Sequence, residues 1–182
     1  MDLLAHAAYG VAFCSRTGLA GGAKGPSRRA GKFHVLDWTA WAAVLFGILP
    51  DVASMGPPLI AYLVGGMHGN FFRDIPAGPL ALYRWMHSLI VALAVSGILR
   101  LAWRPLFIPS LAWPLHVLMD SWTHGSGIFL TPIFFPLSTW GINGLRWWQH
   151  PEVVLAYWLV LPAVWFAVWR WRQRKGNIVH GV

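Results

Sequence analysis

The chain has 182 residues, of which 57% are hydrophobic and only 11% are charged, whereas ordinary soluble domains have roughly 45–50% apolar and about 25% charged residues. This composition excludes an ordinary soluble domain and predicts an integral membrane protein, because several apolar stretches approach the roughly 20 residues that a membrane-spanning helix needs. The formal net charge is +8, but the basic residues lie beside apolar segments, so we expect anionic lipid headgroups rather than nucleic acid as the partner.

The first predicted element is a short apolar helix over residues 3–14. Residues 15–34 are basic and Gly-rich and have almost nothing to bury, so we expect a flexible loop. The apolar segment 35–50 is expected to end at a cluster of prolines that should forbid a continuous helix, with a short helical piece over 59–66. The prolines are Pro50, Pro57 and Pro58.

A polar connector containing Gly and Pro is expected over residues 67–84. Apolar segments then predict helices over 88–103, 105–122 and 153–169, with a Pro- and Gly-rich aromatic loop over 125–150. The prediction is an all-α membrane bundle of about five membrane helices, with residues 1–182 forming a single domain. The lone cysteine, Cys14, excludes an internal disulfide, and the sequence leaves the oligomeric state open.

The distribution of Lys and Arg predicts the orientation, because cytoplasmic segments collect these residues. Eleven of the fourteen lie in the loop 15–34, at the corner 100–104 or in the tail 170–182. The connectors at 67–86 and 123–150 hold only Arg73, Arg84 and Arg146. We therefore expect a prokaryotic inner-membrane protein with a cytoplasmic loop 15–34, a cytoplasmic C-terminal tail and both connectors outside the cytoplasm.

Histidines and aspartates gather near the extracytoplasmic ends of the predicted helices. Ionisable groups at membrane depth are costly and usually face a partner or a cavity. Because imidazole and carboxylate groups are ligands of first-row metals, a shared divalent metal explains these residue types best. The five candidate ligands, drawn from four helices, are His6, Asp51, His87, His116 and Asp120.

The segment "HVLMDSWTH" carries the densest part of this pattern. His116 and Asp120 stand four residues apart, a spacing that places two side chains on one helix face. The alternative is a structural His–Asp pair joined by a hydrogen bond. His124 would continue the same face if the helix persists to Gly125, and would turn toward a substrate if it does not.

Four segments within residues 1–150 form a pattern found in a known family: "MDLLAHAAYG", "LPD" before a proline-broken turn, "YRWMHSL" and "HVLMDSWTHGSGIFLTPIFFPLSTWGINGLRWW". Together they resemble the YdjM-like family of membrane-bound metal-dependent hydrolases. The family is similar in ligand order to the zinc-dependent phospholipase C and single-strand nuclease superfamily. The resemblance implies an all-helical metal centre built from His6, Asp51, His87, His116 and Asp120, with Asp120 bridging two metals. Leu82 and Met86 stand where many members have His and Thr.

The expected function is a metal-dependent hydrolase that uses one or two divalent ions, with Zn²⁺ favoured. Such an ion lowers the pKa of bound water and stabilises charge on a phosphoryl oxygen. Asp51 would serve as a ligand or as the general base, Arg84 would hold an anionic headgroup, and His124 completes the catalytic set. The expected substrate is a lipid or lipid-linked phosphoester, and His68 is an alternative ligand to His87.

Two other classes of function fit the sequence. One is a b-type haem protein, for which His87 and His116 would be the axial ligands. The other is a non-catalytic membrane scaffold or binding subunit, in which the polar side chains form an interhelical hydrogen-bond network.

Overall fold

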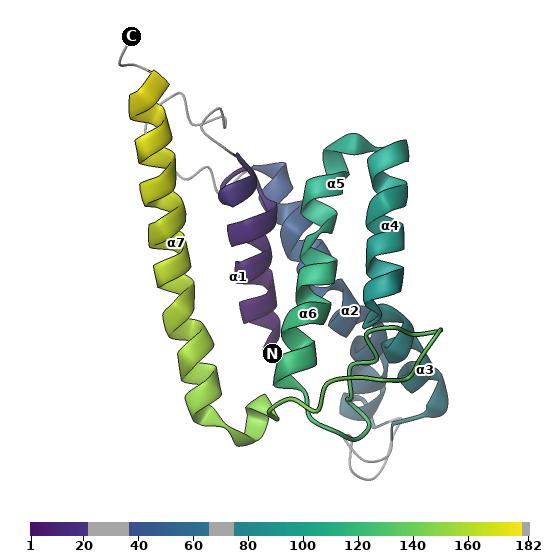
Figure 1. Ribbon diagram of the computed structural model, residues 1–182. Coiled ribbons are helices and arrows are strands. Elements are labelled where there is room, and N and C mark those ends of the chain that lie inside the picture. Colours follow the sequence, from purple (N-terminus) through teal and green to yellow (C-terminus); the bar gives the residue numbers. More distant parts are fainter. Residues whose placement is uncertain (22–36, 66–74, 180–182) are drawn as a thin grey trace.

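The computed structural model describes residues 1–21, 37–65 and 75–179, and within these residues the chain is all-helical, without a strand (Figure 1). The described elements are, in chain order, α1 (Leu3–Cys14), η1 (Leu19–Gly21), α2 (Trp38–Leu63), α3 (Ala77–Met86), α4 (Leu89–Ala102), α5 (Arg104–Ser110), α6 (Ala112–Thr123), η3 (Trp147–Gln149) and α7 (Pro151–Val179). The prediction of an all-helical fold is therefore confirmed.

Most predicted helices are present near their expected boundaries. Helix α1 covers the predicted segment, α4 lies within 88–103, and the predicted helix 105–122 is divided at Leu111 into α5 and α6. Helix α3 was missed, because the Gly and Pro residues of its first turn indicated a connector. Pro76 caps α3 and a further proline stands in its first turn, where a missing N–H costs no intrahelical bond.

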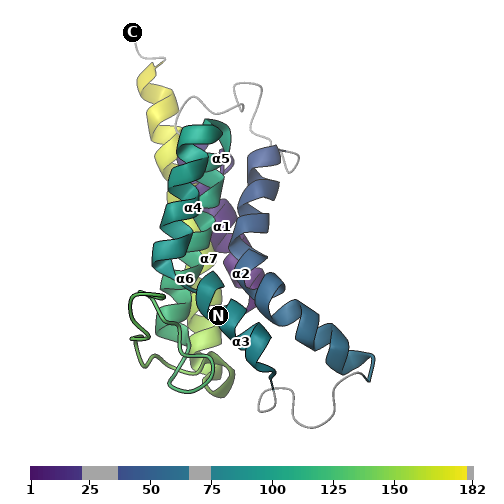
Figure 2. The same cartoon turned by 90° about the vertical axis from the view of Figure 1, so that its right-hand side faces the viewer.

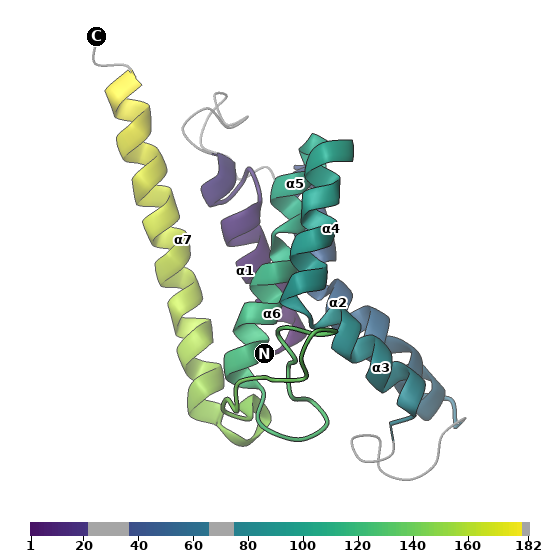
Figure 3. The ribbon, with the colours of Figure 1, turned by 45° about the vertical axis from the view of Figure 1, so that its right-hand side comes forward.

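Helix α2 corrects the prediction that the prolines forbid a continuous helix, since α2 runs from Trp38 to Leu63 through all three of them. In apolar surroundings the other backbone groups have no partner outside the helix, so the helix bends instead of ending. Figure 2 shows the two halves of α2 at an angle to each other. The second half packs against α3, away from the other helices (Figure 3).

Two of the described helices are long and apolar enough to cross a membrane: α2, over Trp38–Leu63, and α7, over Pro151–Gln173. Helices α3 and α4 would add a third span if they count as one, although they meet at an angle of 59°. Large apolar side chains on α7 are exposed, including Leu155, Leu159 and Phe166. Exposed apolar side chains on a long helix suit a lipid-facing surface.

Basic residues gather at one end of the described structure. The C-terminal end of α1, the α4–α5 corner and the C-terminal half of α7 all lie at the upper end of Figure 1. Arg172 of α7 donates a hydrogen bond to the carbonyl of Thr17, which ties two of these parts together. The predicted loop residues 22–34 and the tail residues 180–182 lie outside the described part.

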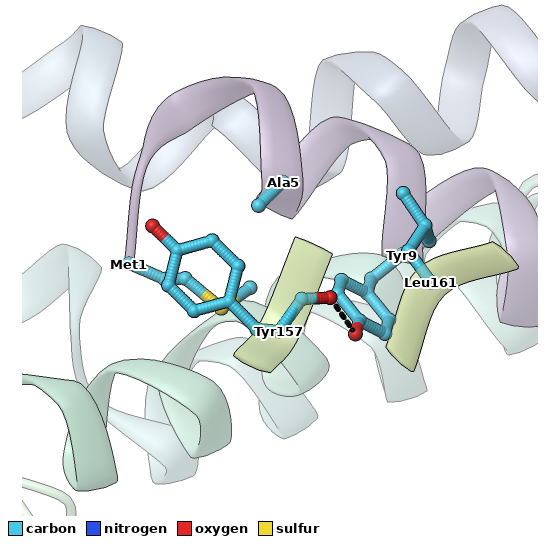
Figure 4. Close-up of a cluster of buried hydrophobic side chains, with 5 residues drawn as sticks. All are labelled: Met1, Ala5, Tyr9, Tyr157 and Leu161. Atoms are coloured by element: carbon cyan, nitrogen blue, oxygen red, sulfur yellow. Dashed lines mark hydrogen bonds between the residues drawn. The ribbon is translucent and has the colours of Figure 1, made fainter. Parts of the chain in front are cut away.

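Helix α7 contacts the other helices mainly through α1, around a small apolar cluster (Figure 4). Tyr9 donates a hydrogen bond of 2.6 Å to the carbonyl of Tyr157. Asp2 caps α1 by accepting from the backbone N–H of Ala5, and its other carboxylate oxygen accepts from the hydroxyl of Tyr157 and the indole of Trp158. The N-terminal end of α1 is therefore held in place by α7.

Small residues allow α1, α2 and α6 to approach closely. A Cβ placed on Gly10 would lie 3.0 Å from the carbonyl oxygen of Ala43 and 3.2 Å from the Cβ of Ala112. A Cβ on Gly47 would lie 3.0 Å from the carbonyl oxygen of His6. Since backbone atoms cannot move aside as a side-chain tip can, these positions set the spacing of the three helices.

We predict that Gly10→Val separates α1 from α2 and destabilises the protein by about 1–3 kcal/mol, the usual cost of inserting methyl groups into a packed interior. Gly97→Val on α4 is the matched control, because a Cβ at Gly97 meets nothing within 4 Å. Thermal unfolding in detergent measures the difference. Equal loss of stability in both variants would contradict the assigned close contact.

Candidate metal centre

The candidate site lies where α1 and α4 begin and α6 ends. His6 stands in the first turn of α1, and His87 lies between α3 and α4. His116 and Asp120 are one turn apart on α6, and Asp51 lies just past the first proline of α2. Residues far apart in the sequence are thus brought together by three helices and one helix junction.

The carboxylate of Asp120 is fully buried and has a different set of neighbours at each oxygen. Its Oδ1 accepts from the amino group of Met1 at 2.5 Å and lies 2.8 Å from His6 Nε2. Its Oδ2 has no hydrogen-bond partner among the described residues. Three imidazole nitrogens face Oδ2: His116 Nε2 at 3.2 Å, His87 Nε2 at 3.4 Å and His124 Nδ1 at 3.5 Å.

Backbone carbonyls orient two of the histidines. His116 Nδ1–H donates to the carbonyl of Gly47 at 2.7 Å, and His87 Nδ1–H donates to the carbonyl of Tyr83 at 3.0 Å. A carbonyl oxygen can only accept, so in each ring Nδ1 carries the proton and the neutral form has a lone pair on Nε2. The two Nε2 atoms lie 3.2 Å apart. Two lone pairs at this distance repel unless a cation, either a proton or a metal ion, lies between them.

Asp51 provides the exposed edge of the site. Its Oδ1 lies 3.3 Å from His87 Nε2 and 3.7 Å from His116 Nε2. Its side chain is 24% exposed, whereas those of His87, His116 and Asp120 are 0% exposed. A water or a substrate therefore reaches the cluster most directly beside Asp51.

These side chains form a group that could hold a metal ion. One ligand atom from each of His6, Asp51, His116 and Asp120 lies within 4.8 Å of the others. His87 adds a nitrogen that lies within 3.4 Å of three members of the wider cluster. Nitrogen and oxygen ligands in a buried cluster are typical of a first-row divalent metal. Carbonyls that accept the other ring N–H, as those of Gly47 and Tyr83 do, commonly orient its histidines.

His124 joins the site although α6 ends before it. The helix stops at Thr123, and His124 has an extended backbone with φ −108° and ψ 134°. Its ring nonetheless faces Asp120, and its Nδ1 lies 3.2 Å from the hydroxyl of Tyr83. Burial lowers the pKa of His124 to about 4, so this imidazole is neutral at neutral pH.

The structure does not bring every predicted site residue to the cluster. Arg84 is exposed on α3 and has no hydrogen bond or ion pair with the described residues. His68, the alternative to His87, and Arg73 lie outside the described residues. His150 and Glu152 pair with each other at 2.8 Å, both exposed, at the start of α7.

The chain was also compared with known proteins. No family model, curated protein or solved structure matches it. The resemblance to the YdjM-like family therefore stays a prediction.

Sequence reasoning missed three contributors to this site. Tyr83 and Gly47 act through backbone carbonyls, and the amino group of Met1 contacts both Asp120 and Thr123. One indication of these contacts was present in the sequence: Tyr83 stands four residues before His87, a spacing at which its carbonyl can meet the His87 ring at the end of a helix. Contacts made by backbone groups cannot otherwise be recognised from the type of residue.

We predict that His116→Ala and Asp120→Ala each lower the metal content of the purified protein, because each removes a buried ligand atom. Elemental analysis of detergent-purified protein measures the effect. His150→Ala, which changes an exposed histidine outside the cluster, is the control and should leave metal content unchanged. Normal folding with full metal content in both site variants would make His116 and Asp120 a structural pair.

Proposed function

We propose that this protein is a membrane-bound metal-dependent hydrolase that cleaves a phosphoester of a lipid or lipid-linked substrate at the membrane surface. The observation that carries the proposal is the convergence of unprotonated nitrogen and carboxylate oxygen atoms on one buried point. Nε2 of His87 and Nε2 of His116 face each other at 3.2 Å, with the unpaired Oδ2 of Asp120 beside them. A divalent cation would offset this repulsion better than a single proton would.

The spacing of the ligand atoms favours zinc. Tetrahedral zinc with bond lengths of 2.0–2.2 Å requires neighbouring ligand atoms to be about 3.3–3.6 Å apart. The distances among His87 Nε2, His116 Nε2, Asp51 Oδ1 and Asp120 Oδ2 include 3.2, 3.2, 3.3, 3.4 and 3.7 Å. Three of these side chains are buried, and Asp51 stands at the exposed fourth corner. A catalytic zinc site keeps one position for water, so water would take this corner if Asp51 acts as the general base instead of as a ligand.

A second ion has a candidate place at the other oxygen of Asp120. Oδ1 faces His6 Nε2 and accepts from the amino group of Met1, which an ion at this oxygen would displace, while Oδ2 faces His87 and His116. A carboxylate with ligand nitrogens on both sides suits a bridge between two ions, which would make Asp120 shared and His6 specific to the second ion. The proposed cofactor is accordingly one or two Zn²⁺ ions.

Bound zinc supplies an activated water and stabilises negative charge on a phosphoryl oxygen. Asp51 reaches the exposed edge, so it can complete the ligand set or accept the proton of the attacking water. His124, facing Asp120 from the loop side, is placed to exchange a proton with the leaving group. Arg84 is exposed one turn before His87, and we assign it to the anionic headgroup.

The proposed setting is the extracytoplasmic surface of a prokaryotic inner membrane. The proposal keeps about five membrane helices, with the short α1 and the α5–α6 pair crossing beside the longer α2 and α7. The site lies at the end of the helices opposite the exposed Arg16, Arg100 and Arg104. Because cytoplasmic segments collect Lys and Arg, this arrangement supports a cytoplasmic C-terminus and an extracytoplasmic site.

The loop after α6 supports an amphiphilic substrate. It exposes apolar side chains beside the site, with Leu137 82% exposed and Phe134 stacked on Trp140. The same loop is fixed to α4, since Leu89 N–H donates to the carbonyl of Ile133. A fixed apolar wall next to a polar metal site suits a lipid whose phosphoester emerges from hydrocarbon.

The geometry disfavours the haem alternative. Axial ligands stand on opposite faces of the porphyrin, and Nε2 atoms 3.2 Å apart leave no room for the macrocycle between them. The scaffold alternative predicts a hydrogen-bond network without a metal, so elemental analysis of the wild-type protein separates it from the hydrolase.

We predict that metal-loaded protein hydrolyses a long-chain phospholipid analogue in mixed micelles more efficiently than a short-chain, water-soluble phosphodiester. The physical reason is that the apolar loop holds the acyl chains while the site receives the headgroup. Steady-state rates at several micelle surface concentrations give the comparison.

Equal efficiency on both substrates, without dependence on surface concentration, would remove the interfacial part of the proposal. Absence of turnover of any phosphoester by metal-loaded protein would contradict the phosphoesterase assignment.

We also predict that Ser126→Cys is labelled from the extracytoplasmic side only, since Ser126 is exposed in the loop beside the site. A membrane-impermeant maleimide added to spheroplasts and to inverted vesicles makes the measurement, in a Cys14→Ala background. Labelling from the cytoplasmic side alone would reverse the proposed orientation.

A further inference from the structure

Tyr83 contacts the candidate metal centre at two points through its backbone and its ring. It is almost completely buried on α3, and its carbonyl accepts the Nδ1–H of His87 at 3.0 Å. Its ring stacks on the ring of His87, with centroids 3.9 Å apart and an interplanar angle of 24°. Backbone and ring together fix both the rotation and the proton position of His87.

The hydroxyl of Tyr83 reaches a second histidine. It donates a hydrogen bond of 2.9 Å to the carbonyl of Phe129 and lies 3.2 Å from His124 Nδ1. Because its only proton is used by the carbonyl, the hydroxyl oxygen meets His124 as an acceptor. His124 Nδ1 must then carry a proton, which leaves Nε2 as the nitrogen with a lone pair when the ring is neutral.

His124 needs such a contact because its backbone does not fix the ring. The residue follows the end of α6, and its carbonyl accepts from the N–H of Gly144 at 2.9 Å, which holds the main chain in place. The ring is bounded by Phe129 and Trp148, with centroids 6.4 and 5.9 Å away. These aromatic neighbours restrict its position but cannot distinguish its two nitrogens. Asp120 Oδ2 also faces Nδ1, but at 3.5 Å and without a hydrogen bond, so the Tyr83 hydroxyl at 3.2 Å is the closer polar partner.

We propose that Tyr83 is a positioning residue that holds His124 with Nδ1 protonated, so that Nε2 is the nitrogen that exchanges a proton during hydrolysis. The inference rests on the proposed function for its effect on turnover, while the effect on the tautomer stands independently. Tyr83 thereby contacts two histidines that both face Oδ2 of Asp120, His87 from the α3–α4 junction and His124 from the loop after α6.

The test is Tyr83→Phe in the full chain, which removes the hydroxyl and keeps the ring and the carbonyl. Long-range ¹H–¹⁵N spectra of histidine-labelled protein in detergent report which ring nitrogen carries the proton, and His124→Gln identifies the His124 signals. Tyr9→Phe is the matched control, because it removes a tyrosine hydroxyl bonded to a backbone carbonyl at the α1–α7 contact.

The expected result is an Nδ1–H pattern for His124 in the wild type and in Tyr9→Phe, and a shift toward Nε2–H in Tyr83→Phe. Metal content should stay unchanged, because no proposed ligand atom is removed. Turnover of bis(p-nitrophenyl) phosphate should fall roughly 10-fold in kcat, at the lower end of the range for hydrogen-bond partners that orient the histidines of a metal site, with KM unchanged. In a His124→Gln background, Tyr83→Phe should have no further effect.

An unchanged His124 pattern in Tyr83→Phe overturns the inference, and so does a changed pattern with unchanged kcat. Failure of the proposed function is a separate result, since a wild-type protein without metal would refute the hydrolase while the tautomer comparison remained valid.

Discussion

The buried carboxylate of Asp120 is the constraint on which the rest of the site depends. An unpaired carboxylate in an apolar interior costs several kcal/mol, so cationic or hydrogen-bonding partners must be brought to it. They come from separate parts of the chain: His6 from α1, His87 from the α3–α4 junction and His116 from α6 itself. The close packing of α1 against α2 at Gly10 and Gly47 is what allows His6 to reach this point.

Much of the fold followed from composition and apolar run length. Helices α1 and α4 matched their apolar segments closely, because each segment is bounded by polar or conformationally distinctive residues. The error at α2 has a physical cause. In water a proline usually ends a helix, because the backbone groups that lose their intrahelical hydrogen bonds can bond to water instead. In apolar surroundings those groups have no such partners, so the helix bends and continues. The high apolar content predicts a membrane protein, but it does not determine which of the short helices cross the membrane.

The sequence predicted which side chains form the candidate site better than it predicted how those side chains are oriented. The spacing of His116 and Asp120 specified one face of one helix, and the shared depth of His6, Asp51 and His87 indicated a common partner. Arg84 lies outside the buried cluster, exposed on α3, and its role toward an anionic headgroup stays a prediction. The role of Tyr83 depends on a loop contact that no local pattern encodes.

The carbonyl groups that orient His87 and His116 have a consequence for how this site tolerates change. Both acceptors belong to the main chain, at Tyr83 and Gly47, so a change of side chain does not remove the acceptor group itself. An alanine scan would register ring stacking and helix spacing at these positions but not the orienting hydrogen bonds themselves. Replacing the amide that follows each carbonyl by an ester, which weakens the carbonyl as an acceptor, is the substitution that addresses them. The hydrogen bond at Nδ1 of each imidazole thus depends on the backbone conformation and not on the identity of a side chain.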